Sequence, residues 1–407
     1  MFGLFSAEKI REARKDFPVL KDEIYFDNAC MSLKPIQVIN KLNEYYTQYT
    51  ACLGRSNHAF ARKLTEEIDK ARSEVRKFIN AKEDSEIIFT RNTTEGINLI
   101  ANSFGLKKED EVIISDKEHN SNLIPWLKLK KTAGIKVVIS KTNDDGTFNL
   151  ENFRKSFSGR TRLVSVIYTS NIDGVTNPVK EIIKISHLHK VPVLVDAAQA
   201  VPSFEVDVRK IDADFLAFSG HKMCGPSGIG VLYGKKQLLE KLDQFLVGGE
   251  TVQDSTYDSY IPEKIPNKFE AGLQDYAGII GLGEACRYLR KIGMNNISRH
   301  EIKLNALLTN LLNDEIDTGK IKILGPKDTK QRGGIFSFII EGIDIHHVSR
   351  ILDSSKKIMT RSGAHCVHSW FNARNLNGSV RASLYFYNTE DEVRKFAEEI
   401  QKIIKLG

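Results

Sequence analysis

The 407-residue sequence is poor in cysteine, and none of its cysteines stands in a Cys-x-x-Cys pair. The five cysteines are odd in number and widely spaced: Cys30, Cys52, Cys224, Cys286 and Cys366. Disulfide frameworks need an even set of cysteines, and zinc sites need closely spaced ligands. The sequence therefore argues against both, and we expect no metal centre.

Long apolar runs are also absent. No stretch approaches the ~20 residues that a membrane-spanning helix requires. The start, Met1 to Phe5, is too short for a signal-peptide core and is followed at once by charged residues. We therefore expect a cytoplasmic protein without a membrane partner.

The sequence shows no internal repeat, no low-complexity segment and no cluster of basic residues. Lysine and arginine number 59 against 52 acidic residues, which leaves a net charge of +7 spread along the chain. A scattered charge of this size indicates a solvated surface, and we expect no nucleic-acid partner. The content of 41% hydrophobic and 27% charged residues is typical of a globular protein, and the length suggests two domains.

Strand and helix patterns alternate from about residue 86 to residue 233, which predicts βαβ crossovers and an α/β fold with a mainly parallel, helix-covered sheet. After Gly249 the alternation stops at a polar segment, 250–267, and long helical patterns follow. The tail predicts strands at 334–340, 357–361 and 379–387. We expect a large domain over 21–289 and a smaller α/β domain formed by 1–20 and 290–407.

Lys222 is the first candidate catalytic residue. It follows the apolar run 214–218, which predicts a buried strand, and a glycine-rich turn comes directly after it. Ligands of open α/β sheets bind at this edge. A partly desolvated lysine there would have a lowered pKa and could link covalently to a carbonyl group, although a solvated loop lysine is the ordinary alternative.

Asp196 ends the neighbouring apolar run, 191–195, and is followed by small residues. An acid at this place suits the pyridinium nitrogen of pyridoxal phosphate, and Gln199 could reach the phenolic oxygen of the same ring. A helix-capping role for Asp196 is the alternative. Together with Lys222, the pair favours pyridoxal phosphate as cofactor.

Further polar groups could hold the phosphate and the ring of this cofactor. Thr93 and Thr94 begin a predicted helix, whose free N–H groups suit an anion, although they could also be ordinary caps. Ser219 and His221 flank Gly220 beside Lys222 and add possible donors. His119 follows a predicted strand and could lie flat on the cofactor ring.

Many short motifs in one order resemble those of the class V, fold-type I pyridoxal-phosphate enzymes, most closely the SufS-like (group II) cysteine desulfurases and selenocysteine lyases. The matching motifs extend over nearly the whole chain and begin at Tyr25, Asn92, Glu118, Ser170, Val195, Ser219, Phe269, Arg361, Val380 and Tyr387.

The resemblance implies a role for each matching residue. Lys222 matches the Schiff-base lysine, Asp196 the pyridinium partner and Gln199 the phenolic-oxygen donor. His119 matches the ring-stacking histidine, and Cys366 the nucleophile that takes the sulfur. Thr94, Ser219 and His221 match phosphate ligands. Asn171 and Arg381 match residues that bind the substrate carboxylate. Arg361 and His58 match other pocket residues.

Two positions depart from the family pattern. Leu273 stands where a threonine usually serves the phosphate of the partner subunit, and Cys30-Met31 stands where small residues are usual. We expect Cys30, Cys52 and Cys224 to be inert, because free cysteines are commonly small buried hydrophobes.

The resemblance implies an L-cysteine desulfurase that forms a persulfide on Cys366 and releases L-alanine. It also implies a homodimer and a protein that accepts the sulfur. His365 and Arg361 would help to ionise Cys366. A selenocysteine lyase, another class V lyase or aminotransferase, and an inactive sulfur-transfer scaffold are the alternatives.

Overall fold

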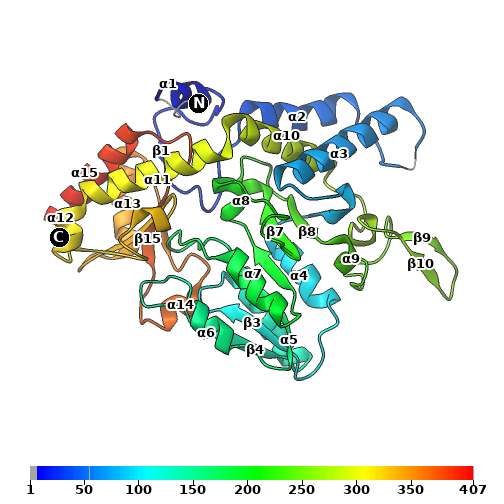
Figure 1. Cartoon of the computed structure of the whole chain (residues 1–407). Coiled ribbons are helices and arrows are strands. Elements are labelled where there is room, and N and C mark those ends of the chain that lie inside the picture. Colours follow the sequence, from blue (N-terminus) through cyan, green and yellow to red (C-terminus); the bar gives the residue numbers. More distant parts are fainter. Residues whose placement is uncertain (1–6, 55, 407) are drawn as a thin grey trace.

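The computed structural model describes residues 7–54 and 56–406, so the short apolar start, Met1 to Phe5, lies outside the described residues. A seven-stranded sheet is covered by helices, and a four-stranded sheet with its own helices lies beside it (Figure 1). The predicted α/β class, with a mainly parallel large sheet and a smaller α/β part, is confirmed. No helix in these two ranges is both long and apolar enough to cross a membrane.

The large sheet has the strand order β2-β8-β7-β6-β5-β3-β4. Neighbours run parallel except β8, which is antiparallel to both β2 and β7. In sheet order the strands are β2 (Ile87–Thr90), β8 (Gly230–Gly234), β7 (Phe215–Ser219), β6 (Val193–Asp196), β5 (Thr161–Ile167), β3 (Glu111–Ser115) and β4 (Lys136–Ser140).

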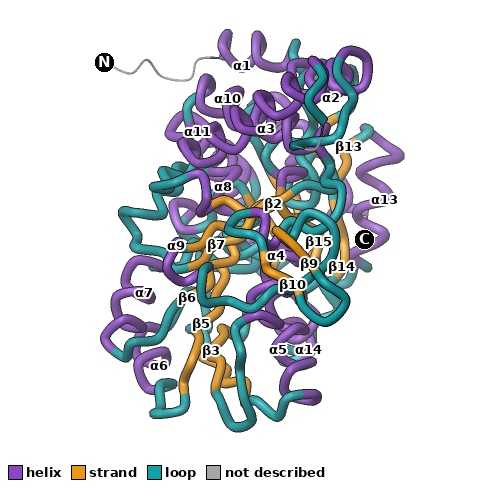
Figure 2. The backbone as a smooth tube through the Cα atoms, turned by 90° about the vertical axis from the view of Figure 1, so that its right-hand side faces the viewer, coloured by secondary structure: helices purple, strands orange, loops and turns teal. Residues whose placement is uncertain are grey.

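Alternate residues of these strands point to opposite faces, and both faces are buried. Val193 and Val195 pack into one apolar cluster, while Leu194 packs into another. The first cluster includes side chains of α3 (Ala59–Phe78), α7 (Val179–Leu188) and α10 (Tyr276–Ile292). The second includes side chains of α4 (Thr93–Ser103) and α5 (Asn120–Thr132). Figure 2 shows the strands enclosed between helices.

The smaller sheet is antiparallel, with the order β11-β12-β15-β14. Its strands are β11 (Ile321–Ile323), β12 (Ile335–Ile340), β15 (Ser379–Ser383) and β14 (Arg361–Gly363). Helices α11 (Met294–Leu311), α13 (Ile345–Lys356) and α15 (Glu390–Leu406) share a separate apolar cluster with it. Beside it, β1 (Ile24–Tyr25) pairs in parallel with β13 (Ile358–Met359).

The other elements are short or lie at the edges. The helices are α1 (Ala7–Arg14), α2 (Ile36–Gln48), α6 (Leu150–Lys155), α8 (Ala200–Ser203), α9 (Lys236–Leu239), α12 (Asn313–Asp317) and α14 (His368–Asn372). Single 3₁₀ turns span Asp84–Glu86, Gly220–Lys222, Asn267–Phe269 and Thr329–Gln331. Strands β9 (Val252–Ser255) and β10 (Tyr260–Pro262) form a hairpin.

The structure differs from the sequence prediction in three places. The polar segment 250–267 contains the β9–β10 hairpin. The sequence pattern does not predict this hairpin, because its strands are mostly exposed and lack apolar alternation. The expected strand 357–361 is divided between β13 and β14. The expected strand 379–387 ends at Ser383, and residues 384–387 leave the sheet to bury three aromatic side chains.

The division at residue 20 and residue 290 stays a prediction, and the N-terminal segment contacts both cores. Ala13 and Phe17 belong to the apolar cluster of the large sheet. Ile24 and Phe26 belong to the cluster of the small sheet. The segment between them therefore joins the two cores.

A buried ion pair fixes the Phe269-Glu270-Ala271-Gly272 motif against the large sheet. The Arg72 guanidinium donates to both carboxylate oxygens of Glu270, at 2.8 Å each. Glu270 also accepts from the backbone N–H of Phe89 at 2.7 Å, and Arg72 lies over the Phe89 ring. The pair holds α3, β2 and the segment before α10 together.

We predict that Glu270→Ala destabilises the fold strongly. Removing one partner of a buried pair leaves an uncompensated charge and costs about 3 to 5 kcal/mol. Chemical denaturation of purified wild type and variant measures the difference. Glu151→Ala, which removes an exposed pair with Lys155, is the matched control and should leave the midpoint unchanged. Equal loss in both variants would contradict the assignment.

Candidate active site

A cavity of about 210 Å³ lies at the carboxyl edge of the large sheet, where β5, β6 and β7 end. Parallel strands bring the residues that follow them to one place, as expected for a doubly covered sheet. The lining residues are Ala29, Cys30, Asn92, Thr93, Thr94, His119, Ser121, Ile167, Asn171, Asp196, Ala198, Gln199, Ser219, His221, Lys222, Arg361, His365 and Arg381. All predicted site residues except Cys366 and His58 are among them, and their individual roles stay predictions.

Lys222 ends the 3₁₀ turn that follows β7. The turn is closed by hydrogen bonds from Met223 N–H to the Gly220 carbonyl, at 3.0 Å, and from Gly220 N–H to the Ile229 carbonyl, at 2.9 Å. Desolvation lowers the pKa of the Lys222 ammonium, and the Asp196 carboxylate opposes this shift. The lysine is therefore held in a form that loses its proton more readily than a surface lysine.

Asp196 is the last residue of β6 and is buried. Burial raises the pKa of its carboxyl group, and the charge of Lys222 opposes that shift. Its Oδ1 accepts from Ala198 N–H at 3.0 Å. The side chain of Gln199 donates to the Ala29 carbonyl at 2.7 Å, which fixes its amide at the cavity wall.

The N-terminus of α4, where an anion site is predicted, lies at the cavity. Asn92 caps the helix by accepting from Glu95 N–H at 3.0 Å. Thr93 N–H donates to Ser219 Oγ at 2.9 Å, and the two hydroxyls lie 2.6 Å apart. The Thr94 hydroxyl lies 2.7 Å from that of Ser121, a lining residue for which no role is predicted from the sequence. A row of hydroxyl groups thus faces a helix N-terminus, which suits a phosphate.

His119 lies at the cavity as a neutral imidazole. Ser121 N–H donates to Nδ1 of His119 at 3.1 Å, so this nitrogen is the acceptor. Burial, followed by the positive charges of Lys222, Arg361 and Arg381, lowers the pKa of His119 to about 3. A neutral aromatic ring can cover a protonated pyridine ring without charge repulsion. His221 is also neutral, because burial and the charge of Lys222 lower its pKa to about 4.

Arg381 and Asn171 have spare hydrogen-bonding capacity inside the protein. Arg381 is buried and donates to the Asn171 carbonyl at 3.0 Å and to Asp27 at 3.1 Å, but its Nε has no hydrogen-bond partner among the described residues. The Asn171 side chain donates to the His365 carbonyl at 2.8 Å, and its oxygen accepts no hydrogen bond within the part of the chain that the structure describes. Such groups are costly to bury unless a ligand pairs with them, and a guanidinium suits a carboxylate.

Cys366 lies in the turn between β14 and α14, next to the cavity but outside its lining. Its sulfur accepts from Nη2 of Arg361 at 3.6 Å. Nη1 of the same guanidinium lies 3.2 Å from the sulfur of Cys30. One cation therefore contacts two thiols, and only the Cys366 partner was expected.

The expectation that His365 helps to ionise Cys366 is wrong. His365 is buried, and burial together with the charges of Arg381 and Arg361 lowers its pKa to about 2. Its Nε2 pairs with the Ser379 hydroxyl at 2.9 Å. His365 is thus a neutral structural residue, and Arg361 supplies the positive charge at Cys366.

His58 is not brought to the cavity within one chain. Its side chain caps α3 by accepting from Ala61 N–H at 3.3 Å. Leu273 is 70% exposed and lines a different cavity with Phe245 and Leu246. Cys224 is buried, and burial raises the pKa of its thiol to about 12.

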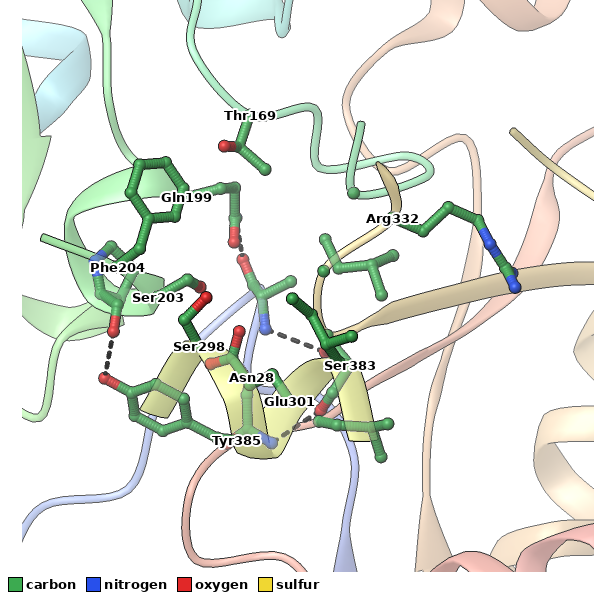
Figure 3. A pocket seen from close by; sticks show the side chains of 18 of the residues that line it. Asn28, Thr169, Gln199, Ser203, Phe204, Ser298, Glu301, Arg332, Ser383 and Tyr385 are labelled. Atoms are coloured by element: carbon green, nitrogen blue, oxygen red, sulfur yellow. Dashed lines mark hydrogen bonds between the residues drawn. The ribbon is translucent and has the colours of Figure 1, made fainter. Parts of the chain in front are cut away.

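A second cavity, of about 260 Å³, borders Lys222 and Gln199 and extends between the two sheets. In Figure 3 the carboxyl group of Glu301 lies among Ser298, Ser203 and Asn28, while the guanidinium of Arg332 points away from them. Burial raises the pKa of Glu301 well above its usual range. The turn that contains Lys222 thus lies between the two cavities.

Comparison with known proteins identifies the family. The family model described as Aminotransferase class-V matches residues 24–396. The chain is 40% identical over 401 residues to a probable cysteine desulfurase of Halalkalibacterium halodurans, covering 96% of this chain and 97% of that protein. It is 39% identical over 399 residues to one of Pyrococcus abyssi, covering 97% of each.

Solved structures show the same fold. An apo cysteine desulfurase from Thermococcus onnurineus NA1 superposes with a TM-score of 0.93 at 38% identity, covering 97% of this chain and 98% of that one. The cysteine desulfurase CsdA from Escherichia coli gives 0.91 at 31% identity, with 98% of each chain covered. These matches confirm the resemblance seen in the motifs and the expectation of pyridoxal phosphate. The chain therefore belongs to the class-V aminotransferase family of pyridoxal-phosphate enzymes.

Proposed function

We propose that this protein is an L-cysteine desulfurase that uses pyridoxal phosphate, accepts sulfur on Cys366 and releases L-alanine. The observation that carries the proposal is the position of Cys366. Its sulfur contacts the guanidinium of Arg361, which lines the same cavity as Lys222 and Asp196. The names of the relatives, which are cysteine desulfurases of 36–40% identity, support the same reaction.

The cavity residues fit the cofactor. Lys222 and Asp196 line one space from neighbouring strands, and the hydroxyls of Thr93, Thr94 and Ser219 gather at a helix N-terminus. Asp196 would hold the ring nitrogen, His119 would cover the ring, and the hydroxyl groups and His221 would hold the phosphate. The bound cofactor supplies an electron sink that lets bonds at the substrate's α-carbon break.

The chain's own residues would bind and orient L-cysteine. The buried Nε of Arg381 has no partner in ranges 7–54 and 56–406, and its planar guanidinium suits the substrate carboxylate, with Asn171 beside it. Lys222, whose pKa is lowered by desolvation, would take and return the proton at the α-carbon.

Cys366 would then attack the substrate sulfur. A sulfur–sulfur bond forms, the carbon–sulfur bond of the substrate breaks, and the carbon fragment gains a proton to become alanine. Positive charge beside a thiol stabilises the thiolate that this step requires, and Arg361 provides it. Cys366 is half-buried, so a protein that accepts the sulfur could reach its persulfide.

We also infer that the protein works as a homodimer. His58, expected at the pocket, caps α3 away from the cavity of its own chain, and a partner subunit would have to supply it. Leu273, Leu246 and Val247 are exposed apolar residues. An apolar surface of this kind commonly marks a protein interface.

We predict that Cys366→Ala lowers sulfur release from L-cysteine by about 10³-fold or more, because the nucleophile is lost. Purified protein loaded with pyridoxal phosphate is incubated with L-cysteine and a reductant, and both alanine and sulfide are assayed. The same variant should keep activity on L-selenocysteine, whose selenium can leave without the thiol. Wild-type rates on L-cysteine in the variant would refute the assignment, and failure of the wild type to take up the cofactor would favour the inactive scaffold.

We predict that Leu273→Asp weakens the homodimer. A buried carboxylate in an apolar contact is unfavourable, so sedimentation should shift from twice 45.9 kDa toward 45.9 kDa. Leu188→Asp, on an equally exposed leucine at the end of α7, should leave sedimentation unchanged. A wild-type protein that sediments as a monomer would rule out the homodimer.

We predict that the neutral state of His365 makes the fold sensitive to acid. Its pKa is lowered from 6.5 to about 2, so below pH 6.5 the unfolded chain binds a proton that the folded chain does not. The contribution of His365 to the free energy of unfolding is therefore full above pH 6.5. It falls as the pH decreases, by up to about 1.4 kcal/mol per pH unit. Denaturation between pH 7 and pH 4 should show a shallower fall in His365→Gln; equal slopes would mean that His365 is protonated in the folded state.

A further inference from the structure

Cys30 and Cys366 are held by the same side chain. Nη1 of Arg361 lies 3.2 Å from the sulfur of Cys30, and Nη2 lies 3.6 Å from the sulfur of Cys366. The two cysteines come from opposite ends of the chain, since Cys30 follows β1 and Cys366 follows β14. The planar guanidinium thus contacts both thiols.

The position of Cys30 distinguishes it from the other cysteines. It is half-buried and lines the cavity with Lys222 and Arg381. Cys224 and Cys286 are fully buried, and burial raises the pKa of both thiols. Cys30 therefore combines access to the cavity with a positive charge beside its sulfur, which are the conditions for a reactive thiol.

We propose that Cys30 is a second sulfur-accepting residue, which takes the outer sulfur of a persulfide on Cys366. The proposal rests on the proposed desulfurase function. It replaces the expectation that Cys30 is inert.

The transfer balances without an oxidant or a reductant. The Cys30 thiolate attacks the outer sulfur of the Cys366 persulfide, and a new sulfur–sulfur bond forms on Cys30. The old sulfur–sulfur bond breaks, and Cys366 leaves as a thiolate. Arg361 contacts both sulfurs, so it stabilises the attacking thiolate and the leaving thiolate alike.

A persulfide on Cys366 reaches farther than the thiol does. The outer sulfur extends the Cys366 side chain by one bond of about 2.05 Å. Cys366 lies in a turn in which His365 and Cys366 both have left-handed backbone conformations, with φ of 48° and 60°. Transfer would leave the sulfur at the cavity wall and free Cys366 for a second turnover. Each chain would then store two sulfurs before an acceptor arrives.

The test counts and locates sulfur after reaction with L-cysteine. Protein loaded with pyridoxal phosphate is mixed with L-cysteine in the absence of reductant, alkylated with iodoacetamide and analysed by peptide mass spectrometry, while alanine is counted per chain. We expect the wild type to carry added sulfur on both Cys366 and Cys30, with about two alanines per chain. Cys30→Ser should carry it on Cys366 alone and form roughly half as much alanine.

Three further samples separate a specific transfer from general reactivity. Cys366→Ala should carry no sulfur on Cys30. Cys52→Ser, a half-buried cysteine outside the cavity, should behave as the wild type. A mixture of Cys366→Ala with Cys30→Ser chains should leave Cys30 unmodified, because the transfer occurs within one chain.

The results that would refute sulfur transfer to Cys30 differ from those that would refute the desulfurase function. Alanine formation with sulfur on Cys366 but none on Cys30 would refute only the second acceptor, as would a Cys30–Cys366 disulfide or equal labelling of Cys52. Absence of alanine from the wild type would refute the desulfurase function and this proposal with it. If Cys30→Ser fails to bind cofactor, Cys30→Ala serves in its place.

Discussion

The site depends on how the charges of its side chains are balanced when folding buries them. Lys222, Arg361, Arg381 and Asp196 line one cavity, and Asp27 pairs with Arg381; burial disfavours the charge of each of these five side chains. The ion pair of Arg381 with Asp27, at 3.1 Å, and the attraction between Lys222 and Asp196 offset part of this cost. Burial and the excess of positive charge together explain the neutral histidines. His119, His221 and His365 stay neutral because burial lowers the pKa of each, and the charges of neighbouring lysine or arginine residues lower it further.

The two sheets contribute different residues to the cavity. The large sheet brings Asp196 and Lys222 to its edge because β6 and β7 are parallel neighbours. The small sheet supplies the arginines: Arg361 of β14 and Arg381 of β15 are directly paired residues in an antiparallel register. Gly174 permits the close approach of the two parts, since its φ is 74° and a Cβ atom there would lie 1.8 Å from the Arg332 carbonyl oxygen. The residues predicted to bind the substrate and those predicted to bind the cofactor thus meet where the two sheets come together.

The sequence was most informative where function follows a regular element. Asp196 and Lys222 come directly after buried apolar runs, so the edge of the sheet on which they lie could be predicted from the pattern alone. The roles of Asn171, Arg381 and Cys366 came from family motifs, because loop positions carry no periodic signal. The contacts of Cys30 with Arg361 could not be predicted in either way, since residues 331 positions apart meet only in the packed fold. The β9–β10 hairpin was missed because its exposed strands lack apolar alternation.

Arg361 has a geometry that lysine could not reproduce. An ammonium group is a single point of charge, whereas the guanidinium presents separate nitrogens in one rigid plane. Here one nitrogen contacts the sulfur at the cavity wall and the other contacts the sulfur in the half-buried turn. The positive charge is therefore shared between the thiol of Cys30, which lines the cavity, and the thiol of Cys366, which lies beside it. The shape of the Arg361 side chain, and not only its charge, therefore allows it to contact both Cys30 and Cys366.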